Sequence, residues 1–356
     1  MAVTLRDIAE RTGVSPSVVS TVLSGRDNGT FVSESTRQKV LQVAESLNYT
    51  PVRSGRPRGS RRLRRQRTEQ FIGIWDPDYS PHTAQMIHHL QIALRQYAET
   101  SGAEAEDDFG LRLLTPEDLP RLDAIGIMGM LLLSPVPLPR EAAAATIPSV
   151  LLGELENPPR ELVQVHLDNL EAGRLVGDYL WELGHRRIGF LARQAHEKVS
   201  QRRLTGLQEA WQLGGGDPAN VGSYPYDTVK TLGPRDAVRH AILALFGPEA
   251  ASGNRPTALV CYDESVAAVA AQTLAELGVR VPAEVSLIGF EDTPNQAESA
   301  IPALTTVRAP LAEIATETIG RLYLLHESEM PEELEPRDIA FSGELIRRAS
   351  CAAPQG

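Results

Sequence analysis

Residues 4–25 read TLRDIAERTGVSPSVVSTVLSG, and the cap and turn residues in this stretch predict how the front of the chain folds. Thr4 can cap a first helix, and Gly13 ends that helix because glycine readily adopts the left-handed conformation of a tight turn. Ser15 can cap a second helix, with Pro16 at its first position, where the missing N–H is not needed. Two short helices joined by a four-residue turn that contains glycine are typical of a helix-turn-helix.

A third helix is predicted after Ser33, which stands at a capping position. Its apolar residues recur with helical spacing at Val40, Val43, Ala44 and Leu47. In a helix-turn-helix the second helix meets base edges in the major groove of DNA. Its outward residues are therefore candidate DNA contacts: Pro16, Ser17, Ser20 and Thr21. The alternative interpretation is that they are ordinary polar surface positions on a small helical bundle.

Charge is distributed unevenly along the 356 residues, whose net charge is −11. Residues 1–68 contain 13 Arg and Lys against five Asp and Glu, for a net charge of +8, which leaves −19 for the other 288 residues. A basic head joined to an acidic body indicates that an anion-binding module is attached to a second module of a different kind. At roughly 100–200 residues per domain, the length predicts two or three domains.

Residues 51–67 contain eight arginines, two prolines, two glycines and no acid. Such a composition cannot bury a core, so we predict a linker at 51–69 between a helix-turn-helix head at 1–50 and a body at 70–356. A solvated spacer is one interpretation of this segment. Eight uncompensated arginines favour a polyphosphate partner, and together with the head they predict binding to double-stranded DNA.

The acidic body alternates between two kinds of pattern. Strand-like runs stand at 71–75, 130–133, 149–152, 162–167, 187–191, 257–261 and 285–290. Helical patterns stand between most of them, at 82–99, 170–183, 202–213, 234–246 and 263–277. Such alternation predicts parallel sheets with helices on both faces, and the number of strands favours two α/β lobes. In such folds ligands bind in the crevice at the carboxyl ends of the strands.

Several other classes of protein are disfavoured. No apolar run reaches the roughly 18 residues of a membrane span, and charges occupy the place of a signal peptide's apolar stretch, so no membrane partner is expected. Two cysteines exclude a disulfide scaffold and favour the cytoplasm. The nucleotide-binding and hydrolase motifs of common enzymes are absent, and Ser200 stands where a zinc-protease helix beginning at His196 needs a second histidine. We expect no catalytic residue, no metal and no cofactor. A plain small-molecule binding protein is a further alternative, against which the basic head weighs.

Long motifs in the same order resemble the LacI/GalR family of transcriptional repressors. In the head these are residues 4–25 and VSESTRQKVLQVAESLNYTP at 32–51. In the body, HLDNLEAGRLVGDYLWELGHRRIGFL at 166–191 resembles the family's DN-x-x-A-G and L-G-H-x-x-I segment, and LGVRVPAEVSLIGFED and IPALTTVRAPL resemble two later stretches. The resemblance is weak between 77 and 148. It implies a periplasmic-binding-protein-like body whose two lobes, crossed by three chain segments, close around a small effector. It also implies a homodimer on a near-palindromic operator, with allosteric control by the effector.

The resemblance assigns roles to residues of the head. It implies base contacts from Pro16 and Ser17, and it places Thr21 where relatives commonly have an arginine. Threonine makes single and less discriminating bonds to bases, so the resemblance implies an operator code that differs from the usual one. Thr4, Ser15 and Ser20 match positions that contact phosphates in relatives.

The linker departs from the family pattern at Arg58, where relatives carry a leucine that wedges into the minor groove. Gly-Arg-Pro at 55–57 is similar to the core of an AT-hook, which predicts that Arg56 and Arg58 insert into a narrow A·T-rich minor groove. The alternatives are a sequence-independent phosphate clamp and a leucine helix in a shifted register, and Arg53 is a further candidate DNA contact of the linker.

The resemblance also names candidate effector contacts. Arg203 matches a family arginine that bonds effector oxygens, and Asp263 matches an aspartate that accepts from hydroxyls or amines. The alternatives that involve no effector are a surface charge for Arg203 and a helix N-cap for Asp263. Asp76 and Ser134 follow predicted strands. Glu154 stands one residue beyond the position of a usual family aspartate, a departure that puts a sugar effector in doubt.

Overall fold

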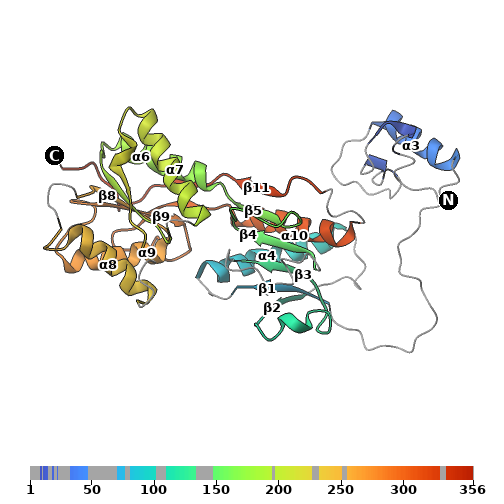
Figure 1. Ribbon diagram of the computed structural model, residues 1–356, viewed down its shortest axis with the longest axis horizontal. Helices are drawn as coiled ribbons and strands as arrows, with labels where there is room; N and C mark the ends of the chain where they lie inside the picture. The colour runs from blue at the N-terminus through green and yellow to red at the C-terminus, as the bar shows by residue number, and fades with distance from the viewer. Residues whose placement is uncertain are drawn as a thin grey trace. The chain divides into compact units, whose positions relative to one another are not determined.

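The computed structural model describes residues 9, 11–14, 18–19, 22, 33–46, 70–76, 81–101, 110–133, 147–194, 197–226, 232–250, 255–328 and 334–355. The chain divides into two compact units, Met1–Arg67 and Thr68–Gly356. Each unit is described by itself (Figure 1).

The first unit holds a small helical core. Helix α3 spans Glu34–Ser46, and the hydroxyl oxygen of Ser33 accepts a hydrogen bond from the amide of Thr36 at 3.2 Å, which confirms the predicted cap. Gly13 has a φ of +73° and ends the preceding turn by donating its amide to the carbonyl of Ala9. The buried apolar residues are those expected from the helical spacing: Ala9, Val19, Val22, Val40 and Ala44. Leu47 lies outside the described residues.

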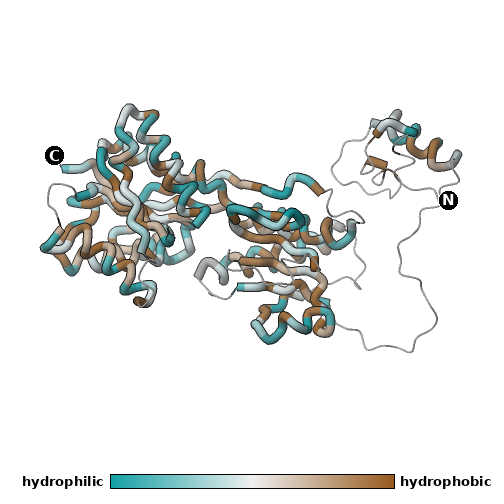
Figure 2. Tube along the Cα trace, in the orientation of Figure 1, coloured by the Kyte–Doolittle hydropathy of each residue, from teal (hydrophilic) through white to brown (hydrophobic). Residues whose placement is uncertain are grey.

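The second unit contains two lobes, each built on a six-stranded sheet. In the N-terminal lobe the strand order is β11-β5-β4-β3-β1-β2, and all neighbours are parallel. The strands are β1 (Phe71–Trp75), β2 (Gly110–Leu113), β3 (Ile127–Leu132), β4 (Ser149–Leu152), β5 (Val163–Leu167) and β11 (Asp338–Phe341). Helices α4 (Pro81–Ser101) and α10 (Leu311–Glu327) pack together, and a 3-10 turn spans Leu119–Arg121. Hydrophobic residues follow the strands of this lobe (Figure 2).

The C-terminal lobe has the strand order β12-β10-β9-β8-β6-β7, in which only β12 is antiparallel. Its strands are β6 (Ile188–Leu191), β7 (Val221–Ser223), β8 (Ala258–Cys261), β9 (Ser286–Glu291), β10 (Thr305–Arg308) and β12 (Glu344–Ile346). Its helices are α6 (Asn169–Glu182), α7 (Lys198–Leu213), α8 (Pro234–Phe246) and α9 (Glu264–Glu276), with a 3-10 turn at Pro218–Asn220. Figure 1 shows α6 and α7 on one side of β8 and β9, and α8 and α9 on the other.

The chain crosses between the lobes three times. It passes from β5 to α6 at residues 167–169, from β10 to α10 at 308–311, and from β11 to β12 at 341–344. The predicted two-lobed α/β fold with three crossings is therefore confirmed. All seven predicted strands and all five predicted helices of the body are present, with small shifts at their ends.

Candidate functional site

A cavity of about 200 Å³ lies between the two lobes. Its wall is formed largely by residues at the carboxyl ends of parallel strands, where ligands bind in folds of this kind. The N-terminal lobe contributes Asp76, Thr83, Met86, Leu133, Leu152, Gly153, Val165, His166, Leu167 and residues of α10. The C-terminal side contributes Asn169, Arg193, Val199, Arg203, Tyr262, Asp263, Glu264, Ser265, Glu291, Thr293 and Gln296.

Arg203 is positioned on this wall by the close packing of α6 against α7. A Cβ atom on Gly173 of α6 would lie 2.3 Å from the carbonyl oxygen of Arg203, so only glycine fits there. Buried to 4% exposure, Arg203 donates from Nε to Asn169 Oδ1 at 2.9 Å and from Nη1 to the carbonyl of Tyr262 at 2.6 Å. Its guanidinium stacks 4.1 Å from the ring of Phe290. Within the described part of the chain Nη2 has no hydrogen bond, which leaves one donor group for a ligand.

Asp263 lies at the end of β8, where it both caps a helix and lines the cavity. Its Oδ1 accepts from the amide of Val266 at 2.7 Å and so caps α9. The helix-cap alternative for this residue is therefore correct, and a ligand contact by the same carboxylate is compatible with it.

Two further carboxyl groups, Glu264 and Glu291, line the cavity beside Asp263. Burial and, after it, the neighbouring Glu291 raise the pKa of Glu264 to about 7, although Glu264 accepts hydrogen bonds from Thr306, Thr293 and the Asp292 amide. Burial, followed by the charge of Asp263, raises the pKa of Glu291 to about 8. The cavity therefore carries groups whose protonation changes near neutral pH, as binding sites often do.

The backbone at the end of β9 holds Glu291 and the next residue, Asp292, in an uncommon conformation. Glu291 has a φ of 98° and Asp292 a φ of 55°, a region that costs residues other than glycine of order 1–3 kcal/mol each. Asp292 is fixed by Arg308 and Arg348, each at 2.8 Å, and its amide by Glu264. Sequence reasoning missed Glu291, although two acids directly after a buried strand of a parallel sheet are a detectable signal.

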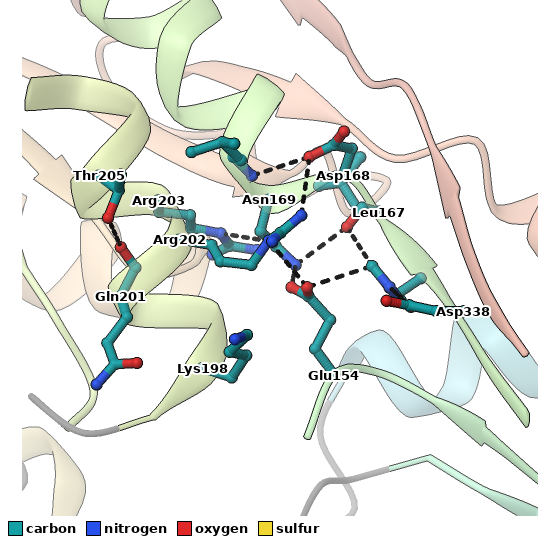
Figure 3. A network of polar contacts seen from close by, with 12 residues as sticks. Glu154, Leu167, Asp168, Asn169, Lys198, Gln201, Arg202, Arg203, Thr205 and Asp338 are labelled. Carbon is teal, nitrogen blue, oxygen red and sulfur yellow. Dashed lines mark hydrogen bonds and ion pairs between the residues drawn. The ribbon is translucent and has the colours of Figure 1, made fainter. Parts of the chain in front are cut away.

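The remaining candidates occupy different places. Asp76 is buried on the cavity wall and accepts a hydrogen bond from the hydroxyl of Thr83. Gly153 lines the cavity, whereas Glu154 next to it is held by Asn169 at 2.7 Å and by Arg202 at 3.0 Å. Figure 3 shows this group. Ser134 lies outside the described residues.

All candidate DNA contacts also lie outside the described residues: Thr4, Ser15, Pro16, Ser17, Ser20, Thr21, Arg53, Arg56 and Arg58. Among the residues that are described, no three His, Cys, Asp or Glu side chains form a group that could hold a metal ion. No helix in that part of the chain is both long and apolar enough to cross a bilayer.

Comparison with known proteins agrees with the sequence motifs and the fold. Residues 4–52 match the family model for bacterial regulatory proteins of the lacI family, and residues 177–351 match that for a periplasmic binding protein-like domain. The chain is 29% identical over 372 residues to the HTH-type transcriptional regulator MalR of Streptomyces coelicolor, covering 100% of this chain and 98% of that protein. It is 30% identical over 366 residues to an HTH-type transcriptional regulator encoded in the aml 5' region of Streptomyces limosus, covering 98% and 94%.

A solved structure supports the same relationship. A complex of the transcriptional regulator CelR with cellobiose is 25% identical and superposes with a TM-score of 0.61, covering 98% of this chain and 99% of that one. The expected resemblance is confirmed on both parts of the chain, and the chain belongs to the lacI family of bacterial transcriptional regulators.

Proposed function

We propose that this transcriptional regulator is a cytoplasmic repressor whose affinity for operator DNA is set by a small polar effector bound between the lobes. The observation that carries the proposal is the cavity at the strand ends with the buried Arg203 on its wall. A buried guanidinium with an unused donor suits a hydroxyl or carboxylate oxygen, because its planar fork bonds such groups directionally.

The chemistry of the wall favours an effector that carries several hydroxyl groups, with or without an amine. Asp76 and Asp263 offer carboxylate oxygens that accept from hydroxyls or amines, Glu291 offers a carboxyl group whose raised pKa of about 8 keeps its proton at neutral pH, and Arg203 supplies a donor. Apolar side chains such as Met86 complete the wall and can pack against C–H faces. The cellobiose bound to the related CelR has this hydroxyl-rich chemistry.

For the head, we propose that one group of residues contacts bases and another contacts phosphates, as the sequence indicates. Pro16, Ser17 and Thr21 meet base edges, and Thr4, Ser15 and Ser20 orient the head on phosphates. Two chains pair through residues 70–356, and the arginines of the linker at 51–69 meet over the centre of the operator. Arg56→Ala combined with Arg58→Ala then weakens binding more on an A·T-centred site than on a G·C-centred one. Equal losses would favour the phosphate clamp.

The experiment combines a ligand screen with DNA binding. Sugars, amino sugars, nucleosides and amino-acid derivatives are screened by thermal shift, since a molecule that binds only the folded state raises the melting temperature. Each hit is then added to a gel shift on the DNA upstream of the protein's own gene. We expect a hit to change DNA affinity and to be recovered unchanged. Turnover of the hit would indicate an enzyme, and ligand binding without any DNA binding would indicate a plain binding protein.

Arg203→Lys tests the cavity directly, because lysine keeps the charge and loses the fork. We expect the thermal shift by a hit to disappear; the ligand-free melting temperature falls as well, because Arg203 is buried and bonded to Asn169 and Tyr262, so each shift is measured against the variant's own ligand-free value. Arg235→Lys is the matched control, because Arg235 lies on the same lobe and bonds the exposed Gln272 on the surface. An unchanged ligand response in Arg203→Lys would contradict the proposed site.

A further inference from the structure

Two ion pairs cross the boundary between the lobes beside the cavity. They join the loop after β4, in the N-terminal lobe, to the first turns of α7, in the C-terminal lobe. Glu154 Oε1 lies 3.0 Å from Arg202 Nε, and Glu156 Oε2 lies 2.9 Å from Lys198 Nζ. Lys198 and Arg202 are four residues apart and therefore share one face of the helix. Figure 3 shows Lys198 and Arg202 on the side of α7 that faces Glu154.

The two pairs differ in burial. The side chain of Glu154 is 4% exposed, whereas that of Glu156 is 60% exposed. A buried carboxylate is tolerated only with partners, and Glu154 has Asn169 Nδ2 at 2.7 Å and the ring of His166 at 3.9 Å. His166 lies on β5 of the same lobe, and Asn169 begins α6 at the first crossing, so Glu154 is held by its own sheet and by the crossing. Arg202 adds a contact from α7 of the other lobe.

The contact between Glu154 and Arg202 weakens as the two lobes move apart. Arg202 Nε is buried and close to the carboxylate, yet its N–H has no aligned hydrogen-bond acceptor. Attraction between the two is therefore ionic and falls with distance. A small rotation of the C-terminal lobe changes it directly.

Asn169 connects this pair to the cavity. Its Nδ2 donates to Glu154 Oε2, and its Oδ1 accepts from Arg203 Nε at 2.9 Å. Arg202 and Arg203 are neighbours on α7; Arg202 pairs with Glu154 (Figure 3), and Arg203 lines the cavity. One amide side chain thus joins the arginine of the binding site to the carboxylate of the interlobe contact.

We propose that Glu154–Arg202 and Glu156–Lys198 form an interlobe latch that fixes the lobe angle, and that Asn169 couples the latch to Arg203. The link to an effector rests on the proposed function. The latch itself does not, because the lobe angle can be measured without ligand. Failure of the latch is therefore distinguishable from failure of the binding site.

The test measures the distance between the lobes in the full chain by single-molecule energy transfer. Dyes are attached at Leu113→Cys and Leu213→Cys, which are exposed positions on different lobes. Cys261 is fully buried, and burial raises the pKa of Cys351 to about 11, so neither native thiol competes well for the dye. Labelled chain is mixed with an excess of unlabelled chain, so that each dimer carries one dye pair.

Arg202→Gln is expected to raise the ratio of molecules with longer interlobe distances to those with shorter ones at least about tenfold, because it leaves Glu154 buried without its partner on α7. The control is Arg174→Gln, which also removes an ion pair made by an arginine Nε, here with the exposed Glu209 within the C-terminal lobe. The control is expected to leave the distances unchanged. Equal distances in Arg202→Gln and the wild type, or equal widening in the control, would overturn the latch.

The exposed pair allows a charge swap that is safe for folding. Lys198→Glu and Glu156→Lys, each alone, place like charges across the boundary. Each is expected to raise the population of molecules with longer interlobe distances about two- to fivefold. Together they restore opposite charges and the wild-type distribution. A double variant as open as the single variants would overturn the contribution of this pair.

The coupling through Asn169 is tested in the same assay. Asn169→Ala is expected to widen the distances in the wild-type background and to add little in the Arg202→Gln background, because both changes break one chain of contacts. Asn169→Ser is measured alongside as a smaller change in the same buried site. Effects of both Asn169 variants that are fully additive with Arg202→Gln would overturn the coupling.

Discussion

Replacing Glu264 by glutamine should stabilise the body of the protein at pH 8, although it removes a buried and hydrogen-bonded carboxylate. Glutamine keeps the geometry: Oε1 can still accept from the amide of Asp292 and the hydroxyl of Thr306, and Nε2 can donate to the hydroxyl oxygen of Thr293. The carboxylate itself is costly, because burial and the nearby Glu291 raise the pKa of Glu264 from 4.5 to about 7.

The sign follows from linkage between protons and folding. Between pH 4.5 and 7 the folded state keeps a proton on Glu264 that the unfolded state has released, so wild-type stability falls as the pH rises through this window. Over the full window the loss amounts to about 3 kcal/mol, at about 1.4 kcal/mol for each unit of pKa. Glutamine does not titrate in this pH range, so the stability of the variant does not fall in this way. We expect a gain of about 2–3 kcal/mol at pH 8 and less than about 1 kcal/mol at pH 5.

Urea denaturation at the two pH values, followed by tryptophan fluorescence, measures this difference. Glu276→Gln is the matched control on the same helix, because a hydrogen bond from Arg239 lowers the pKa of the exposed Glu276. This control should lose a little stability at pH 8 rather than gain it. The same change in stability at pH 5 and pH 8 for Glu264→Gln would refute the reasoning.

Three further predictions follow from single contacts. Gly173→Ala places a methyl group 2.3 Å from the backbone oxygen of Arg203 and should destabilise the protein by about 1–3 kcal/mol in urea denaturation. Gly320→Ala, with open space around it, should instead stabilise α10 by about 0.5–1 kcal/mol. Equal effects of the two substitutions would contradict the close packing of α6 against α7. Ser33→Ala removes the cap of α3 and should cost about 1 kcal/mol, seen as a lower melting temperature of the head; an unchanged value would show that the cap is not stabilising. Burial lowers the pKa of His185 from 6.5 to about 4, so stability should fall as the pH drops from 6.5 toward 4, and His185→Gln should flatten this acid-side slope.

The elements that could be predicted from sequence are those with a continuous apolar signal. Strands such as β3 and β8 are buried on both faces and read as unbroken hydrophobic runs, as central strands of parallel sheets do. The strands that were not predicted are short or carry polar residues. β12 has only three residues. β10 begins with Thr305 and Thr306, whose hydroxyls can be fully buried because they form hydrogen bonds with the Arg348 amide and with Glu264.

One missed element had a readable signal. Helix α10 carries Leu311, Ile314, Ala315, Ile319 and Leu322 with helical spacing, and all five are buried. Its neighbours in sequence, Pro310 and the TTVR strand, do not by themselves show that the chain has returned to the first lobe at this point.

The candidate site was predictable in part. Arg203 and Asp263 were found through motif positions, and Asp76 through the strand-end rule, and all three line the cavity. Glu154 was expected at the effector, whereas its carboxylate is held by Asn169 and Arg202. Asn169 begins α6, 15 residues further along the chain, and Arg202 lies on α7, almost fifty residues further, so local sequence patterns do not reveal these contacts.

The threefold crossing between the lobes has a consequence for synthesis on the ribosome. The first lobe completes its sheet with β11, which pairs with β5 from 174 residues earlier in the chain, and the second lobe completes its own with β12 immediately afterwards. Neither lobe can therefore complete its sheet before residue 338 has been made, and both become complete within a few residues of each other. A premature stop shortly before residue 338 would leave two unfinished sheets at once, each with an open edge, rather than one sound lobe and one missing lobe.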